Sequence, residues 1–298
     1  MSGSLRWESD GRDWPLREHS RFVPTGSLRW HAQVMGHGPA ILLLHGTGAA
    51  THSWRDMAPL LASDYTVIAP DLPGHGFTQG RPRGGLTLDG ISSALEDLLS
   101  ALDIKPAMVV GHSAGAAIGL QLAKRAQGDI PVVGFNPALL PFPGPAANLF
   151  PALAKMLFVN PLVPRFFARM LRVPGETERF LKRATGSTID ARGLACYETL
   201  LTNSRHCAGA LGMMANWDLQ AFADTLPAND CPALLVHWSG DSAVPGWSAK
   251  EAAGLLPRGE VCVLPRLGHL AHEEEPGAAC EIIRQFAADH GIQSRKEA

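Results

Sequence analysis

A serine held between two glycines is the feature of this chain that most directly indicates chemistry. The segment 111–115 reads GHSAG, follows an apolar run at 107–110 and precedes an amphipathic run at 114–126. A Gly-x-Ser-x-Gly motif between a buried strand and a helix is typical of a nucleophile elbow, whose tight turn lifts the serine hydroxyl clear of the sheet. Ser113 is therefore the expected nucleophile, and its alternative role is that of a helix N-cap.

A serine hydroxyl needs a base that removes its proton and an acid that orients the base. His269 follows the last predicted strand and is the expected base, whereas the helical spacing of its competitor His272 favours a packing or surface role. Asp241 follows the strand predicted at 233–237, so the chain order Ser, Asp, His is satisfied. The alternative for Asp241 is an ordinary turn residue within the segment 239–242, SGDS.

Other polar residues near these positions are given structural roles. Asn136 ends the strand before the one that leads to Asp241, but an amide carries no charge that could stabilise an imidazolium. The acidic run at 273–275 is interpreted as the solvated start of a helix, where acids interact favourably with the helix dipole. Three histidines are expected to be hydrogen-bonded supports in the core: His45, His75 and His237.

Acyl transfer also needs backbone N–H groups aimed at the oxyanion that forms. Ala114, directly after the nucleophile, is expected to supply one, and Thr47 the other, because the loop 45–48, HGTG, bends sharply after a buried strand. The same glycines together with Asp71 imitate a dinucleotide-binding fingerprint. Thr51 occupies its third small position, however, and a rigid turn follows Asp71, so we expect no bound cofactor.

Composition narrows the class of protein further. A formal net charge of −2 provides no basic surface for nucleic acid. Five cysteines without C-x-x-C spacing argue against a disulfide framework, and the spacing His269-x-x-His272 differs from that of the common zinc helix, so no metal is expected. The charged N-terminal segment and the lack of a long apolar run predict a cytoplasmic protein with no transmembrane segment.

Alternating strands and helices are predicted to position these residues. After a hairpin at 21–35 with a turn at 25–26, strands are expected at 40–44, 66–69, 107–110, 131–135, 233–237 and 261–264, and helices at 54–61, 91–102, 114–126, 247–255 and 278–289. The strand at 40–44 is the expected partner of the hairpin. This rhythm predicts an α/β fold with a mostly parallel, eight-stranded sheet, helices on both faces and reactive loops at the carboxyl ends of the strands.

The rhythm stops between residues 138 and 207, where prolines cluster and helical patterns follow one another. We expect a helical cap there, inserted after strand 6 into a core domain formed by residues 1–137 and 208–298. Aromatic and methionine residues concentrate in or beside it: Phe142, Phe150, Met156, Phe158, Phe166, Phe167, Met170, Met213 and Met214. They form either the cap's own core or a pocket for a large, flat, apolar ligand such as a porphyrin.

Taken together, the motifs resemble the α/β-hydrolase superfamily over nearly the whole chain. They are HGTG at 45–48, DLPGHG at 71–76, GHSAG at 111–115, Gly240-Asp241 and Gly268-His269. The resemblance implies a Ser-His-Asp triad and a cap after the sixth strand. The chain departs from the pattern at Trp238, where relatives often carry a glycine three residues before the aspartate.

Three segments carry a narrower resemblance, RDWP at 12–15, WHAQVM at 30–35 and HGTGAATHSWR at 45–55. They are similar to the magnesium-chelatase accessory proteins of bacteriochlorophyll biosynthesis. Two functions therefore stay open. One is a serine-type carboxylic ester hydrolase acting on an ester or thioester of a small apolar substrate. The other is a non-catalytic accessory that binds a tetrapyrrole or contacts magnesium chelatase. The complete set of triad residues favours the hydrolase.

Overall fold

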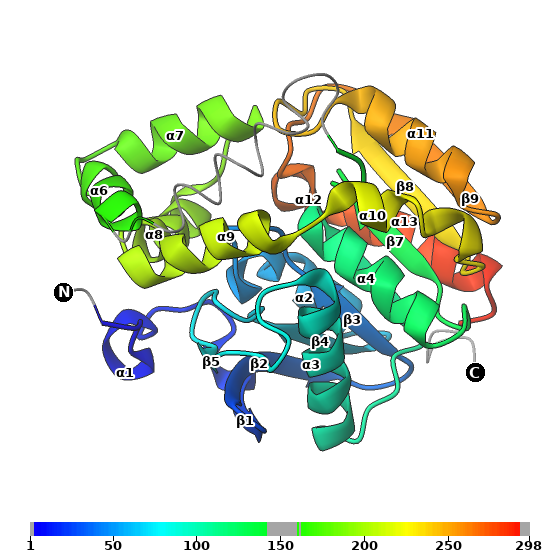
Figure 1. Ribbon diagram of the computed structural model, residues 1–298, viewed down its shortest axis with the longest axis horizontal. Coiled ribbons are helices and arrows are strands. Elements are labelled where there is room, and N and C mark those ends of the chain that lie inside the picture. The colour runs from blue at the N-terminus through cyan, green and yellow to red at the C-terminus, as the bar shows by residue number, and fades with distance from the viewer. Residues whose placement is uncertain (1–2, 142–159, 161, 293–298) are drawn as a thin grey trace.

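A mostly parallel sheet forms the centre of the computed structural model, which describes residues 3–141, 160 and 162–292 (Figure 1). Within these residues it has nine strands. Eight follow the order β1-β2-β4-β3-β6-β7-β8-β9, and the two-residue strand β5 (Gln79–Gly80) pairs with β2. The prediction of a mostly parallel α/β sheet is confirmed, and β5 adds one short strand to the eight that were expected.

The first two strands form the predicted hairpin, and the main strands after it lie parallel to one another. The bounds of the main strands are β1 Ser20–Thr25, β2 Leu28–Gly36, β3 Ala40–Leu44, β4 Thr66–Pro70, β6 Met108–His112, β7 Val132–Phe135, β8 Ala233–Trp238 and β9 Gly259–Leu264. The expectation that the strand at 40–44 pairs with the hairpin is wrong, because β2 pairs antiparallel with β4. Strand β3 lies between β4 and β6 instead. This interior position suits a strand whose side chains from Ile41 to Leu44 are all fully buried.

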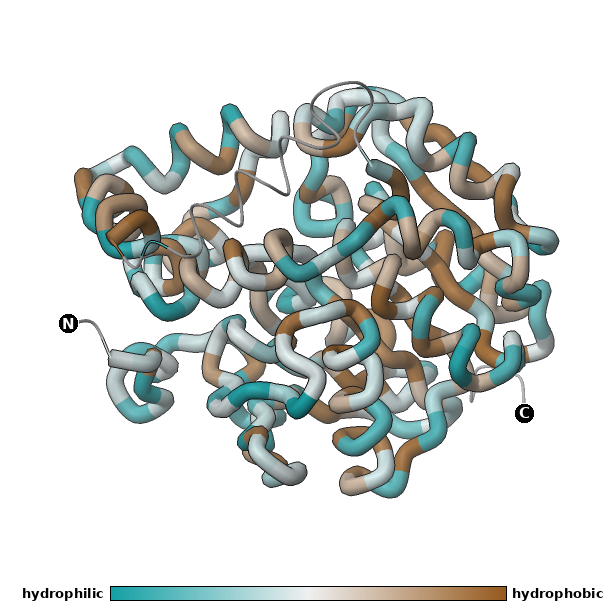
Figure 2. The backbone as a smooth tube through the Cα atoms, in the orientation of Figure 1, coloured by the Kyte–Doolittle hydropathy of each residue, from teal (hydrophilic) through white to brown (hydrophobic). Residues whose placement is uncertain are grey.

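Helices cover both faces of the sheet, as the alternation of side chains along β3 shows. Leu42 and Leu44 belong to a core shared with α3 (Leu88–Ala101), α4 (Ala114–Arg125) and α11 (Gly246–Leu255). Ile41 and Leu43 belong to a second core, shared with α2 (Met57–Leu61) and α13 (Pro276–Asp289). Because each fully buried leucine contributes about 1.5 to 3 kcal/mol, this alternation fixes the strand register strongly. Figure 2 shows the hydrophobic stretches concentrated in the central strands.

A run of helices separates β7 from β8. Its members are α6 Leu162–Met170, α7 Glu176–Thr185, α8 Ala191–Leu201, α9 Ser204–Asn216, α10 Leu219–Ala223 and the 3-10 turn η3 Leu226–Ala228. Figure 1 shows α6 to α9 gathered at one end of the molecule, apart from the helices that flank the sheet. The predicted boundary at 207 falls inside α9, which begins where the Asn203 side chain accepts the Arg205 and His206 N–H groups. The division into a core and a cap stays a prediction.

The aromatic and methionine residues assigned to this region differ widely in burial. Phe142, Phe150, Met156 and Phe158 lie outside the described residues. Met213 is buried, and Phe167 packs edge-to-face on Phe180. Phe166, Met170 and Met214 are exposed. The described members of the set therefore do not form one core. In the same described part of the chain, no helix combines the length and the apolar character that crossing a bilayer requires.

The remaining short helices join these layers. They are α1 Trp7–Asp10, the 3-10 turns η1 Arg17–His19 and η2 Thr51–Trp54, and α12 Ala271–Glu274. The turn η2 follows the loop 45–48, and α12 follows the loop that carries His269. Both lie next to predicted site residues, which makes them the elements that position those residues.

Candidate active site

Ser113 occupies the tight turn between β6 and α4. Its backbone has φ 53° and ψ −116°, a conformation that costs a residue with a Cβ of order 1–3 kcal/mol. A Cβ added to Gly111 would lie 2.4 Å from the Ala116 nitrogen, and one added to Gly115 would lie 2.0 Å from the Leu44 oxygen. Both glycines are therefore required by close backbone approach, and the turn has the geometry of a nucleophile elbow.

The structure brings the predicted base and acid together. His269 Nδ1 lies 2.8 Å from Asp241 Oδ2, and the Asp241 side chain is fully buried. The other carboxylate oxygen, Oδ1, accepts the N–H groups of Ala243 at 2.7 Å and Val244 at 3.0 Å. Since the imidazole donates from Nδ1, its Nε2 is left free to accept a proton. Trp238 does not prevent the turn, because the Asp241 N–H donates to the Trp238 carbonyl at 3.0 Å.

The proposed oxyanion donors lie on two segments that meet at the elbow. A Cβ on Gly46 would lie 3.0 Å from the Ser113 Cβ, so the loop 45–48 runs directly beside the serine. Within the described part of the chain, neither the Thr47 N–H nor the Ala114 N–H donates to another backbone group. Their role as oxyanion donors stays a prediction.

Comparisons with known proteins identify the family of the chain. Its sequence matches the alpha/beta hydrolase family over residues 41–281. The chain belongs to this family. It is 42% identical over 272 residues to the magnesium-chelatase 30 kDa subunit of Rhodobacter capsulatus, and the match covers 88% of this chain and 92% of that relative.

Solved structures share the fold of this α/β hydrolase. An esterase from Thermogutta terrifontis matches with a TM-score of 0.70 and 22% identity, covering 91% of this chain and 98% of the esterase. A loop variant of a haloalkane dehalogenase from Bradyrhizobium elkanii matches with a TM-score of 0.69 and 25% identity, covering 91% and 96%. These likenesses support the α/β-hydrolase fold predicted from the motifs.

Asn136 has a role in this α/β hydrolase that the sequence did not reveal. Its Nδ2 donates to the carbonyls of Gly268 at 3.0 Å and His269 at 2.9 Å, while its Oδ1 accepts the Trp238 N–H at 2.9 Å. One amide thereby ties the end of β7 to the end of β8 and to the histidine loop. It has neither the charge nor the place of the predicted acid, but it holds the backbone of His269, the predicted base. Its φ of 43°, at the end of a strand, is unusual for a residue other than glycine. This sign of a special role is visible in the structure and not in the sequence.

Glu273 corrects the interpretation of the acidic run. The residue is buried, whereas only Glu275 of the run is exposed. Its carboxylate is ion-paired with Arg55 and accepts the hydroxyls of Ser53 and Tyr197, each at 2.7 Å. Burial raises the pKa of Glu273, and the Arg55 charge opposes that rise. The prediction of a solvated helix start is wrong for Glu273, because partners far away in sequence satisfy this carboxylate, but it is confirmed for Glu275, which is exposed and precedes α13.

The Arg55 side chain joins three segments around the site. It bonds Glu273 after the His269 loop and reaches Asp190, the N-cap of α8, at 2.7 Å. A Cβ on Gly193 would lie 2.6 Å from Arg55 Nη2, so this glycine makes room for the guanidinium. His272 belongs to the same cluster, with Nε2 at 2.9 Å from the Ser53 hydroxyl, which confirms a packing role for it.

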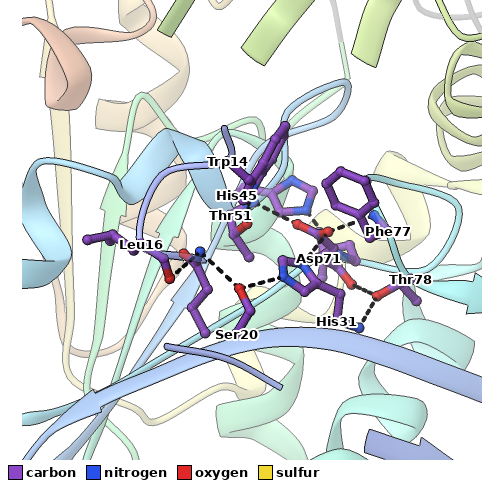
Figure 3. Close-up of polar contacts among 12 residues, drawn as sticks. Trp14, Leu16, Ser20, His31, His45, Thr51, Asp71, Phe77 and Thr78 are labelled. Atoms are coloured by element: carbon purple, nitrogen blue, oxygen red, sulfur yellow. Dashed lines mark hydrogen bonds and ion pairs between the residues drawn. The ribbon is translucent and has the colours of Figure 1, made fainter. Parts of the chain in front are cut away.

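Asp71 lies at the centre of a second buried network, shown in Figure 3. Its Oδ2 accepts the His31 Nδ1–H at 2.7 Å and the Phe77 N–H at 2.8 Å, and its Oδ1 accepts the Thr51 N–H at 2.7 Å. Burial acts to raise the pKa of Asp71, but His31 and these hydrogen bonds outweigh it and lower the pKa. Asp71 therefore links the DLPGHG loop to η2 by hydrogen bonds. Both of its carboxylate oxygens accept hydrogen bonds from groups of the protein itself.

Helix α9 packs directly on the loops beside the elbow. A Cβ on Gly209 would lie 1.8 Å from the Gly74 oxygen, so the helix backbone touches the DLPGHG loop. His206 accepts the Gly76 N–H at Nδ1 and donates from Nε2 to the Gly48 carbonyl at 3.0 Å. One side chain of α9 thus bridges the loop 45–48 and the loop 71–76.

Buried histidines are expected to make the fold labile to acid. Burial lowers the pKa of seven of them: His45, His52, His75, His112, His206, His237 and His272. The value falls to about 4 for His206 and about 3 for His272. In the unfolded chain they titrate near pH 6.5, so between these values the unfolded state binds more protons. Stability is complete above pH 6.5 and is lost below it, by up to about 1.4 kcal/mol per pH unit for each histidine.

Urea unfolding at pH 7.5, 6 and 5 measures this loss. The midpoint should fall steeply between the first and the last pH. The variant His37→Gln, which removes an exposed histidine, should keep the same slope, whereas His272→Gln should flatten it. A midpoint that does not change between pH 7.5 and 5 would refute the assignment of neutral buried imidazoles.

Proposed function

We propose that this α/β hydrolase is a serine-type carboxylic ester hydrolase in which Ser113, His269 and Asp241 act as a triad. The observation that carries the proposal is the 2.8 Å contact between His269 Nδ1 and the buried Asp241 carboxylate, in a chain whose serine turn has elbow geometry. An oriented histidine that presents a free Nε2 is what a serine hydroxyl needs to become a nucleophile.

The reaction follows from these groups. His269 Nε2 takes the Ser113 proton while Oγ bonds to the carbonyl carbon of an ester or thioester. The N–H groups of Thr47 and Ala114 stabilise the resulting oxyanion, each by about 3 to 4 kcal/mol when measured by removal. The imidazolium then protonates the departing alcohol or thiol, and Asp241 stabilises its charge. Water, deprotonated by the same Nε2, hydrolyses the acyl-serine and restores the free hydroxyl.

The substrate class proposed is small and apolar on the side that faces α9. The Thr47 hydroxyl donates a hydrogen bond to Sδ of the buried Met213 in this helix, 3.5 Å away. An apolar side chain of α9 therefore contacts the loop 45–48. A methionine adapts to varied apolar surfaces. The close packing of α9 on Gly74 supports the further proposal that α6 to α9 act as the cap of this site.

Labelling with a fluorophosphonate tests the proposal. Intact mass should show one adduct on the wild type and none on Ser113→Ala, because only an activated serine attacks the phosphorus. The matched control is Ser63→Ala on the surface, which should be labelled like the wild type. Equal labelling of Ser113→Ala and wild type would show that the nucleophile is another residue.

A second function is favoured by one observation, the 42% identity to a relative named as a magnesium-chelatase subunit. It is a non-catalytic accessory that assists magnesium chelatase in bacteriochlorophyll biosynthesis and binds a tetrapyrrole. The labelling experiment separates the two functions, since a binder has no need of an activated serine. Absence of an adduct, together with saturable quenching of tryptophan emission by protoporphyrin IX, would decide for the accessory.

A further inference from the structure

Helix α6 presents an apolar stripe to solvent. Leu162, Phe166 and Met170 follow one another at intervals of four residues and are 62%, 72% and 41% exposed. Val173, in the turn after the helix, is 54% exposed. Residues four apart lie on one side of a helix, so these side chains form a continuous ridge that no described residue covers. Scattered exposed apolar residues are common, but an exposed ridge of large ones indicates a contact surface.

The opposite side of α6 is already used within the protein. Pro164 and Ala168 are buried, Leu171 just beyond the helix joins an apolar cluster with Tyr197 and Leu201 of α8, and Phe167 packs against that cluster. The exposed ridge is therefore the face left over after folding. Its side chains can make new contacts without any unfolding of the helix.

Basic side chains flank the ridge. Arg165, Arg169 and Arg172 recur at intervals of three or four residues, and all three are exposed. At about 100° per residue they form a second stripe beside the apolar one, on the side away from Phe167. Residues 160–185 contain six basic and two acidic side chains, whereas the whole chain has a net charge of −2. Positive charge is thus concentrated where the apolar ridge is exposed.

We propose that α6 docks this protein on an anionic lipid surface. A helix with an apolar ridge and an adjacent arginine stripe lies in a bilayer interface with the ridge among the acyl chains and the arginines at the phosphates. Figure 1 shows α6 at one end of the longest axis of the molecule, where a flat surface can approach it. The inference does not depend on the proposed reaction, since it uses none of the groups at Ser113.

The separation of charge from apolar side chains favours lipid over a protein partner. The arginines lie along one edge of the ridge, which matches a surface that is layered into headgroups and acyl chains. Docking would place α6, which packs against the proposed cap helix α8, where apolar esters dissolve. Docking would therefore bring the proposed site close to the lipid, in which apolar ester substrates are concentrated.

Cosedimentation of the full chain with vesicles tests the inference. Vesicles of phosphatidylcholine with phosphatidylglycerol should bind the wild type, vesicles of phosphatidylcholine alone should bind it far more weakly, and added salt should release it. Each arginine near an anionic surface contributes about fivefold to partitioning, so Arg165→Gln with Arg169→Gln should weaken binding about twenty-five-fold. Phe166→Ser with Met170→Ser should weaken it at least about tenfold.

The control variant is Leu60→Ser with Trp247→Ser, which removes two exposed apolar side chains, 43% and 41% exposed, from other elements. It should bind like the wild type, and all variants should remain folded, with a cooperative urea transition, because every changed side chain is at least partly exposed. Equal binding to both kinds of vesicle, no binding, or unchanged binding of the α6 variants would overturn the proposal. A concentration-dependent dimer that the α6 variants abolish would assign the ridge to a second copy of the chain instead.

Discussion

Replacing Ser113 with alanine is expected to lower kcat for short p-nitrophenyl esters on the order of a million-fold. The variant keeps the buried Asp241–His269 pair but loses the oxygen that forms the acyl intermediate, and removing a triad serine costs about this much elsewhere. KM should change little, because the methyl group of alanine leaves the proposed oxyanion donors in place. Initial rates over a range of ester concentrations give both parameters.

The difference in kcat between Ser113→Ala and the wild type reports the loss of the hydroxyl and not a change in the turn. Serine and alanine both carry a Cβ at the positive φ of position 113, so the backbone strain is the same. Ser63→Ala should retain the wild-type rate, and the urea midpoints of all three proteins should agree. Turnover by Ser113→Ala at the wild-type rate would remove the triad proposal altogether.

Changing Asp241 to asparagine is expected to lower kcat by about ten-thousand-fold. Two backbone N–H groups, those of Ala243 and Val244, donate to Oδ1, so the amide oxygen of asparagine must take that place. The amide NH2 then faces His269 Nδ1, which must accept a hydrogen bond instead of donating one. The proton moves to Nε2, and the imidazole can no longer take a proton from Ser113.

The matched control is Asp218→Asn, which changes the exposed N-cap of α10 and leaves the His269 pair intact. It should keep the wild-type rate, and Asp241→Asn should also react far more slowly with the fluorophosphonate. A wild-type rate for Asp241→Asn, with a folded protein, would mean that another carboxylate orients the histidine. Asn136 is not that residue, because its amide already binds the histidine loop.

The main strands and helices of the sheet region and the tight turn at Ser113 followed from the sequence because their signals are local. The run from Ala40 to Leu44 is apolar at every position, which indicates a strand buried on both faces. The glycines at 111 and 115 indicated a turn that only they could make, and the structure shows backbone atoms within 2.4 Å of where their side chains would begin. Such signals depend on neighbours a few residues away, so no knowledge of the tertiary structure was needed.

The supports of the site could not be predicted in this way, because their partners are distant in sequence. Glu273 lies in an acidic run and is therefore predicted to be solvated, yet its carboxylate is buried. The ion pair with Arg55, 218 positions away, makes this burial possible. Asn136 reads as a poor acid, yet it holds a loop more than 130 positions further on. Each role depends on which groups meet in space, and a buried polar side chain is stable only where such partners exist.

Strand order and exposure were also decided by the tertiary structure. The pairing of β2 with β4 places β3 inside the sheet, although β3 directly follows the hairpin in sequence. Phe166 and Met170 are residue types that usually lie in a core, but they are exposed because the other side of α6 packs against the protein. The sequence by itself determined which segments are apolar and which residues are candidates for the chemistry. Only the fold decided which apolar faces meet each other, because burial is a property of the assembled chain.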